Sequence, residues 1–423
     1  MRKHRKRFLG LLCCPLLFIP LLAYISYTSS QNPVKSHMYS LSCSLRQLGA
    51  TPSLAIFSVF LDRRVSDNQT EIRSYNGHIN GVLRIILVKR RGFTPRLHCL
   101  FNDGTSVPTR DLRGKKFGFY ELTENHQRLY GGYSVHCDVP PSVQLHKGVK
   151  IWLDGPEHSS VLLPVIHANA TRFKMLPSQQ TISRTEHQFT VCVPAMHHTK
   201  NLDADFLSDW FNVHMRLGVS KFRIYYIEPI YGALLNLIQS LRSKVEIDLY
   251  PLFWRENNRA VLQDSWYYLQ TMTVNDCLLR SLYDTEFAFF GDLDEVLIPH
   301  SPEISNWSVL AKRIWVDSTL PGVCFPAFKF YGPGDSMRTS LERSVRADKL
   351  RSKCLVRPLA IFEMGIHHIS KPYEEAFSGR PKISTNITYY AFIHHYHRLH
   401  TKMRLPDTKL RIMDRSLLRF MQT

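Results

Sequence analysis

The chain has 423 residues, which at about one domain per 100 to 200 residues allows two or three domains. Its 44% of hydrophobic residues and its one long apolar run exclude a disordered chain, a collagen and a multi-span membrane protein. Lys and Arg number 54 against 35 Asp and Glu, and five of the cations lie within the first seven residues. The net charge of +19 suits anionic partners such as phosphates, acidic glycans, a membrane face or nucleic acid.

The N-terminus carries the pattern of a membrane anchor. Residues 8–27 are almost wholly apolar and follow the basic residues 1–7, and about 20 such residues span a bilayer as a helix. We expect a single span with a cytosolic tail and a lumenal remainder. A cleaved signal peptide is the alternative, but no A-x-A cleavage pattern precedes Ser29. A lumenal chain agrees with four glycosylation sequons, at Asn68, Asn169, Asn306 and Asn386.

The cysteines predict disulfides. Two of the nine lie inside the predicted span, and no C-x-x-C spacing occurs, which disfavours a zinc ribbon or a thioredoxin site. The remaining seven are scattered, as in lumenal disulfide-bonded chains: Cys43, Cys99, Cys137, Cys192, Cys277, Cys324 and Cys354. The odd number leaves at least one unpaired. Cys43 lies just beyond the predicted membrane span, so we hypothesise that it links two chains in a homodimer.

Two segments precede the main domain. Residues 28–52 are polar and read as a stem. Residues 53–173 hold six short β-prone runs between turn residues, which predicts a small β-sandwich: 54–61, 82–88, 97–101, 133–137, 149–153 and 161–166. Either an inert spacer or a carbohydrate-binding module fits this domain. Residues 174–187 are expected to be a linker.

Residues 188–423 alternate between strand and helix patterns. Strands are expected at 189–194, 222–227, 245–249 and 287–290, and helices at 206–217, 233–242 and 264–282. Repeated βα units predict an α/β domain whose mostly parallel sheet is flanked by helices. The aromatic segment 325–331 is either a sugar-stacking surface or a core strand. Residues 409–421 have the spacing of a basic amphipathic helix.

An acidic pair follows the last of these strands. Asp292 and Asp294 are two residues apart in an extended segment, so both carboxylates leave the strand end on one side. Ligands bind at the carboxyl ends of parallel strands, and carboxylate pairs suit Mg²⁺ or Mn²⁺. The similar string Asp203-Ala-Asp205 precedes a helix and is interpreted as its cap. A solvated acidic turn is the alternative for Asp292.

Several ordered motifs resemble glycosyltransferase family 92. They are Asn-Asp-Cys-Leu-Leu-Arg at 275–280, Phe-Phe-Gly-Asp-Leu-Asp-Glu-Val-Leu-Ile-Pro at 289–299, Lys-Cys-Leu-Val-Arg-Pro at 353–358, Met-Gly-Ile-His-His at 364–368 and Phe-Ile-His-His-Tyr at 392–396, with 210–219. The resemblance covers about 189–404. It implies a type II, single-pass Golgi membrane protein with a GT-A-type catalytic domain. It further implies Mn²⁺-dependent, inverting transfer of galactose from UDP-galactose in β1,4 linkage onto fucose or galactose of glycoprotein glycans.

The same resemblance assigns site residues. Asp292 and Asp294 would hold Mn²⁺ and UDP, and His367, or one of His394 and His395, would complete the metal shell or contact the diphosphate. Residues beside the uracil or the diphosphate would be Val193, Pro194, Ala195, Lys353 and Arg357. For each histidine structural packing is the alternative, and for the two cations a solvated basic face.

Inversion requires a base that takes the proton from the acceptor hydroxyl, and the sequence offers three candidates without choosing among them. These are Asp335, Glu342 and Glu363.

Two other functions compete with this interpretation. A membrane-anchored lectin with an inactive transferase domain would leave the acidic pair dispensable. A haloacid-dehalogenase-like phosphotransferase would use Asp292 as nucleophile, but that motif normally opens its domain, whereas strands precede it here. Nucleic-acid binding is disfavoured because no basic and aromatic stripe follows the anchor.

Overall fold

The computed structural model describes residues 45–49, 52–64, 81–145, 148–155, 159–166, 185–199, 202–230, 232–252, 258–316, 320–331, 336–373, 387–396 and 411–421. The chain divides into two compact units, 1–40 and 41–423, and every described residue lies in the second. The predicted anchor at 8–27, most of the stem and linker, and Cys43 fall outside the described residues. None of the helices described is both long enough and apolar enough to cross a membrane.

The β-rich region, which comprises the described residues up to 166, confirms the six predicted strands. It forms two sheets in which nearly all neighbouring strands are antiparallel. One has the order β1-β2-β3-β7-β6, with β10 parallel to β2, and the other has the order β5-β4-β8-β9. The disulfide Cys99–Cys137 joins β4 of one sheet to β7 of the other. The strands are β1 Arg46–Gln47, β2 Leu54–Asp62, β3 Val82–Arg90, β4 Arg96–Leu100, β5 Ser106–Pro108, β6 Tyr120–Glu121, β7 Tyr130–Asp138, β8 Val149–Asp154, β9 Ser160–Leu163 and β10 Val165–Ile166.

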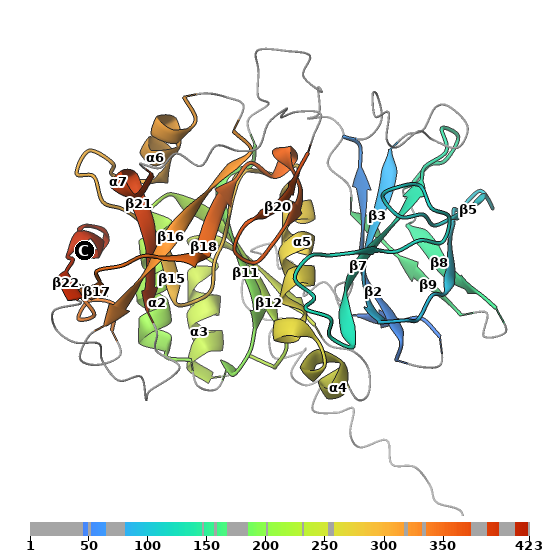
Figure 1. The fold of residues 1–423 in the computed structure, drawn as a ribbon, viewed down its shortest axis with the longest axis horizontal. Coiled ribbons are helices and arrows are strands. Elements are labelled where there is room, and N and C mark those ends of the chain that lie inside the picture. The colour runs from blue at the N-terminus through green and yellow to red at the C-terminus, as the bar shows by residue number, and fades with distance from the viewer. Residues whose placement is uncertain are drawn as a thin grey trace, which may run out of the picture. The chain divides into compact units, whose positions relative to one another are not determined.

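The rest of the unit confirms the α/β class, but its large sheet is mixed rather than mostly parallel, because the strands of its second half pair mainly antiparallel. Its large sheet begins with the parallel strands β13-β12-β11-β14 and continues with β18-β16-β17-β22, while β21 pairs with β15 and β16 (Figure 1). A separate pair joins β19 to β20. The strands are β11 His187–Met196, β12 Val219–Tyr226, β13 Glu246–Pro251, β14 Thr285–Phe290, β15 Glu295–Pro299, β16 Gly322–Tyr331, β17 Glu342–Ser344, β18 Asp348–Val356, β19 Ile361–Met364, β20 Ile369–Pro372, β21 Ala391–Tyr396 and β22 Arg411–Met413.

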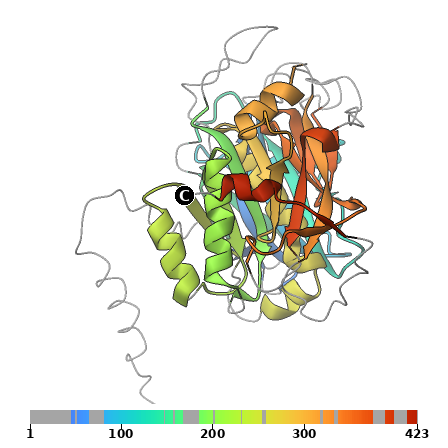
Figure 2. The same ribbon diagram turned by 90° about the vertical axis from the view of Figure 1, so that its left-hand side faces the viewer.

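Helices cover the sheet on both faces. They are α2 Ala204–Arg216, α3 Gly232–Leu241, α4 Asn258–Gln263, α5 Gln270–Ser281, α6 Trp307–Ile314 and α7 Ile387–Tyr390. The apolar stripe of α2 packs with α3 against one face, and Figure 2 shows these two helices in green on the side that carries the red C-terminal turn. As predicted, Asp203 caps α2 by accepting from the backbone N–H groups of Asp205 and Phe206.

Helix α5 packs on the other face and is covered on its far side by the β-rich region. One apolar cluster joins Phe57 and Ile86 of β2 and β3 to Met272 and Leu278 of α5. The disulfide Cys192–Cys277 also ties α5 to β11. The β-rich region therefore shares a core with the α/β sheet, which shows why β2 is buried along its whole length.

Two predicted helices differ from the structure. The helix expected at 264–282 begins only at Gln270, because Tyr267, Tyr268 and Leu269 have left-handed backbone angles with φ of 38°, 56° and 66°. The segment 409–421 is not a continuous helix. Its first part pairs with β17 as β22, and the Asp414 carboxylate then accepts from the backbone N–H of Ser416, starting a 3₁₀ turn at Ser416–Phe420.

A buried ion group fastens the β-rich region to the loop before β19. Asp62 receives hydrogen bonds from Arg64 (Nη2–Oδ2 2.7 Å), and Arg64 also donates to the carbonyls of Leu359 and Ile361 at 3.1 and 2.8 Å. Arg84 donates to the Phe362 carbonyl at 3.1 Å. Burial opposes ionisation of Asp62, but Arg64 and then Arg84 outweigh it and lower its pKa to about 2. Burial lowers the pKa of Arg84 to about 10. Arg64 is the principal partner of Asp62, because its guanidinium lies 2.7 Å from the carboxylate whereas that of Arg84 lies 3.5 Å away.

We expect Asp62→Asn to lower the free energy of unfolding at pH 7 by about 3 kcal/mol, because it leaves two buried guanidinium groups without their carboxylate. The folded pKa of Asp62 lies below its value of 3.8 in an unfolded chain, so its contribution is full above pH 4 and is lost as the pH falls through 2. Thermal unfolding of the full-length protein between pH 2 and 7 tests this. Asp154→Asn, an exposed aspartate in the same region, is the control, and equal curves for the two variants would contradict the prediction.

Candidate functional site

The site lies where the order of the large sheet reverses. From β11 the chain passes through α2 to β12 and on to β13, whereas β14 pairs with β11 on its other side. Ligands of such sheets bind at this switch point, outside the carboxyl ends of the strands. β14 ends at Phe290, the backbone N–H of Gly291 donates to the Cys192 carbonyl of β11 at 3.2 Å, and Asp292 follows.

Three carboxylates, a lysine and a histidine meet at this point, and we name them the acidic corner: Asp292, Asp294, Glu295, Lys353 and His395. The Lys353 ammonium lies 2.8 Å from Asp292 Oδ2 and 3.2 Å from Glu295 Oε2. His395 Nε2 lies 3.4 Å from Asp294 Oδ2, and its Nδ1 lies 3.7 Å from Glu295 Oε1. The side chains of Asp292 and Asp294 are 39% and 23% exposed, whereas those of Glu295 and Lys353 are only 2% exposed. Only the first two carboxylates therefore face solvent substantially.

Glu295 is a supporting residue of the corner. Its Oε2 accepts from the backbone N–H of Asp292 at 3.0 Å, and its own N–H donates to the Asp292 carbonyl at 3.1 Å. Gln270, the first residue of α5, donates to Asp292 Oδ1 at 3.3 Å. Gln270 and Lys353 thus hold the Asp292 carboxylate and Glu295 holds the Asp292 backbone, while the side chain of Asp292 stays 39% exposed.

The charges of the corner shift its pKa values. Burial opposes the charge of Asp292, but Lys353 outweighs it and the pKa of Asp292 is lowered. Burial raises the pKa of Glu295 despite Lys353. Burial also opposes the protonated ring of His395, but the hydrogen bond to Asp294 and the charge of Glu295 raise the pKa of His395. The corner thus keeps an ionised Asp292 beside two groups that favour their cationic forms.

Consecutive histidines of β21 face opposite sides of the strand. His395 is opposite Glu295 in the β15–β21 ladder and faces the corner, whereas His394 contacts His300 and Ser416. Of the two predicted alternatives, the structure therefore brings His395 to the acidic pair. His367 lies close enough for its charge to act on Asp292, and its Nδ1 lies 3.2 Å from the Ser352 carbonyl.

The predicted nucleotide residues divide between two places. Val193, Pro194 and Ala195 are buried near the carboxyl end of β11, beside the corner. Lys353 belongs to the corner itself. Arg357 is not brought there: it lies just after the end of β18, with its guanidinium over the rings of Phe287 and Trp315 at 5.7 and 5.9 Å.

The three base candidates are not brought together. Asp335 lies outside the described residues. Glu342 is on β17 and pairs with Arg411 at 2.5 Å, next to the edge strand of the large sheet. Glu363 is fully buried and accepts from the backbone N–H of Thr123 at 2.7 Å and from the hydroxyl of Tyr120. Its contacts are those of a structural carboxylate.

The β-rich region reaches the site through residues 120–128. Glu124 accepts from the backbone N–H of Ile366, and its carboxylate lies 3.7 Å from His368 Nδ1. These two contacted residues flank His367 in the sequence. The ring of His126 packs on the ring of Trp266 with centroids 4.0 Å apart. Trp266 lies four residues before Gln270 in the sequence. A region that the sequence separates from the catalytic domain therefore supports a loop of the site.

Exposed carboxylate oxygens and an imidazole are the donor set that Mn²⁺ accepts, so Asp292, Asp294 and His395 fit such an ion in chemistry. Among the described residues, these three are not one of the groups whose ligand atoms all lie within 4.8 Å of one another. Two other groups bring ligand atoms within 4.8 Å of one another: His300 with His394 and Asp414, and Glu186 with His187 and Glu246. The second belongs to a partly buried ion network in which Lys221 pairs with Glu246 at 2.6 Å.

The roles of Glu295, Gln270 and Glu124 are not among those predicted from the sequence. Glu295 and Lys353 carried a usable signal, because each is a charged residue next to an apolar strand segment and such residues are buried only when paired. Gln270 and Glu124 carried none, because their partners are distant in sequence.

Comparison with known proteins places the chain in a family. The family model described as glycosyltransferase family 92 matches residues 187–419, more than half of the chain. The chain therefore belongs to this family of glycosyltransferases. A relative from Caenorhabditis elegans, named beta-1,4-galactosyltransferase galt-1, is 25% identical over 286 residues. That match covers 63% of this chain and 62% of the relative, so the chain spans less than two thirds of the relative's length.

Similarity to solved structures is weak. S. aureus TarS 1-349 gives a TM-score of 0.26 at 13% identity, covering 54% of this chain and 60% of that chain. HddC from Yersinia pseudotuberculosis gives 0.21 at 10% identity, covering 49% and 90%.

We expect Lys353→Met to lower the free energy of unfolding by about 3 kcal/mol, because Glu295 then remains buried without its cation. Thermal unfolding of the full-length protein measures this, with Lys349→Met, an exposed lysine on the same strand, as the control. Adding Glu295→Gln to Lys353→Met should recover part of the loss. A Lys353→Met protein as stable as the Lys349→Met protein would contradict the assignment.

Proposed function

We propose that this member of glycosyltransferase family 92 transfers galactose from UDP-galactose, with inversion, in β1,4 linkage onto fucose or galactose of glycoprotein glycans. The observation that carries the proposal is the acidic corner at the switch point of the sheet, inside the segment that matches the family. The name of the C. elegans relative supports the donor sugar and the linkage. The motifs of the family support the acceptor.

Asp292 and Asp294 would hold Mn²⁺, with His395 or His367 beside them. The bound ion supplies positive charge that stabilises the diphosphate leaving group. Lys353 and Gln270 orient the Asp292 carboxylate toward that position. Because Lys353 is bound between two carboxylates, we assign it to orientation of Asp292 rather than to direct contact with phosphate.

Val193, Pro194 and Ala195 would line the uracil at the end of β11. We place the acceptor against the aromatic side chains that precede α5, because exposed rings stack on sugar faces. Tyr267 is 59% exposed there, its backbone is strained, and the neighbouring Trp266 contacts His126. This arrangement gives the β-rich region a part in substrate binding.

We further propose a Golgi membrane location with a single N-terminal span and a lumenal catalytic region, and a homodimer linked through Cys43. The formation of three disulfides among the described cysteines agrees with a lumenal environment. Immunofluorescence of the full-length protein with selective permeabilisation tests the location, and non-reducing electrophoresis of Cys43→Ser tests the dimer.

The donor and metal are tested by assaying the full-length protein with a panel of UDP-sugars, Mn²⁺ and fucose- or galactose-terminated glycans. We expect transfer from UDP-galactose that a chelator abolishes and Mn²⁺ restores. Asp292→Asn and Asp294→Asn should lower kcat/KM by about 100-fold or more, because both remove charge at the leaving group. The control is Asp205→Asn, which changes the second aspartate of the Asp203-Ala-Asp205 string at the start of α2 and should keep normal activity. Glycan binding without transfer by a folded protein would favour the lectin instead.

The role of the β-rich region is tested by Glu124→Ala. Its carboxylate holds the loop that carries His367, so we expect about a tenfold fall in kcat/KM, as for other residues that orient a metal ligand. Glu121→Ala, on the neighbouring β6, is the matched control and should retain activity. A Glu124→Ala enzyme with the same kcat/KM as the Glu121→Ala enzyme would contradict a supporting role of Glu124.

A further inference from the structure

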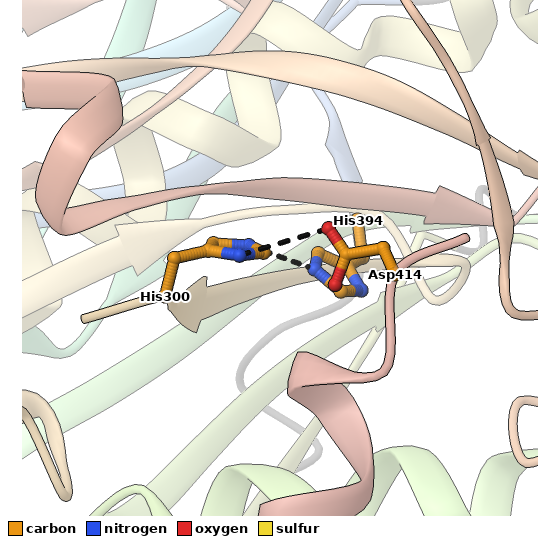
Figure 3. A group of neighbouring side chains, drawn as sticks. All are labelled: His300, His394 and Asp414. Carbon is orange, nitrogen blue, oxygen red and sulfur yellow. Dashed lines mark hydrogen bonds and ion pairs between the residues drawn. The ribbon is translucent and has the colours of Figure 1, made fainter. Parts of the chain in front are cut away.

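Three segments that are distant in sequence converge on a group of metal-ligating side chains away from the acidic corner (Figure 3). His300 follows β15, His394 lies on β21, and Asp414 lies in the C-terminal segment after β22. Their side chains are largely buried, with His394 fully buried and His300 and Asp414 only 17% and 9% exposed. Nothing in the transfer reaction described above uses them.

The distances in this group are those of a tetrahedral coordination shell. The Nε2 atoms of His300 and His394 face each other at 3.1 Å, and the Ser416 hydroxyl lies 3.5 and 3.4 Å from them. Two donors that each lie about 2.05 Å from a tetrahedral zinc ion are about 3.3 Å apart. The three contacts therefore have about the edge lengths of one face of such a tetrahedron.

The second ring nitrogen of each histidine also has a polar neighbour. His394 Nδ1 lies within hydrogen-bond distance of the Tyr396 hydroxyl, at 3.1 Å, whereas His300 Nδ1 and Asp414 Oδ2 are in electrostatic contact at 3.7 Å. Metal-bound histidines characteristically place their other ring nitrogen against such a partner, which fixes the orientation of the ring. Stacking adds to this: His300 lies on Phe392 and His394 on Phe330, with centroids 3.5 and 3.9 Å apart.

We propose that His300, His394 and the 414–416 segment bind a structural zinc ion that fastens the C-terminal segment to the β15–β21 pair. Nε2 of each histidine supplies one ligand, Asp414 or Ser416 supplies an oxygen, and water completes the shell. Two ring nitrogens favour zinc over Mg²⁺ or Ca²⁺, which prefer oxygen ligands.

The surrounding charges limit the affinity of the site. Arg343 donates to Asp414 Oδ2 at 2.8 Å, and Arg419 lies nearby, bound to the carbonyls of Pro299 and Ser301. Both cations oppose a second positive ion. Asp414 Oδ1, which accepts from Ser416 at 2.6 Å, is the oxygen on the other side of that carboxylate from Arg343.

The alternative is a metal-free chain of hydrogen bonds from Tyr396 through His394 to His300, with Asp414 in electrostatic contact with His300 at 3.7 Å. The same distances allow it, since one ring N–H can donate to the facing nitrogen. The two arrangements differ in metal content, which the experiment measures.

The experiment is the zinc content of the full-length protein, supplied with zinc and dialysed, by inductively coupled plasma mass spectrometry. We expect about one zinc per chain in the unmodified protein and in Asp294→Asn, which alters only the acidic corner. His300→Gln and His394→Gln should each lower the retained zinc at least tenfold. An unmodified protein without zinc, or a His300→Gln protein that retains it, would overturn the proposal.

Cobalt provides a second readout that does not depend on stability. Titration of the metal-free protein with Co²⁺ should give the intense visible absorption of a tetrahedral site, and the absorption should be absent from His300→Gln. Because the His300 side chain is 17% exposed and Gln preserves its polarity, this variant should keep the circular dichroism spectrum of the unmodified protein. Absence of the cobalt bands from the unmodified protein would support the hydrogen-bond chain and overturn the zinc site.

Discussion

The burial of α5 on both sides is the constraint on which the rest of the structure depends. Ten of its twelve residues are buried, so each polar side chain on it requires a partner. Asn275 exchanges hydrogen bonds of 2.9 and 3.0 Å with the backbone of Met364, and Asp276 accepts from Ser58 of β2 and from Tyr225 of β12. Gln270, at the N-terminal end, reaches Asp292. One helix thus connects the β-rich region, the large sheet and the acidic corner.

This arrangement explains why the β-rich region is more than an adjoining module. The ion group of Asp62 binds the loop before β19, Tyr120 and Thr123 bind Glu363 on β19, and Glu124 binds the residues around His367. Each contact joins a residue outside the family match to one inside it. Loss of the β-rich region would leave Glu363 and the apolar side of α5 without partners. We therefore infer that residues 187–419 depend on the β-rich region for their stability.

The sequence predicted the repeated strands and helices because their apolar periodicity is local. It also predicted the acidic pair, since a buried strand followed by Asp-x-Asp is visible in one segment. It failed at 264–269, where the strained backbone is stabilised by contacts of Trp266 and Tyr268 with His126 and His197. It failed again at 409–421, where pairing with β17 outweighed the helical spacing. Lys353 illustrates the same limit: its charge suggested a phosphate, but its register opposite the end of β14 brings it to two carboxylates.

Strand β21 shows how one local rule creates two sites from adjacent residues. Because neighbouring side chains of a strand face opposite sides, His395 turns to Asp294 and Glu295 while His394 turns to His300 and the C-terminal segment. A shift of one residue in the β15–β21 register would exchange the two histidines and disrupt both groups. The C-terminal segment holds that register from outside, since Arg419 binds the Pro299 and Ser301 carbonyls and Leu417 is buried in the core. An ion between His300 and His394 would therefore stiffen the strand that positions His395, although it lies on the opposite face from the proposed chemistry.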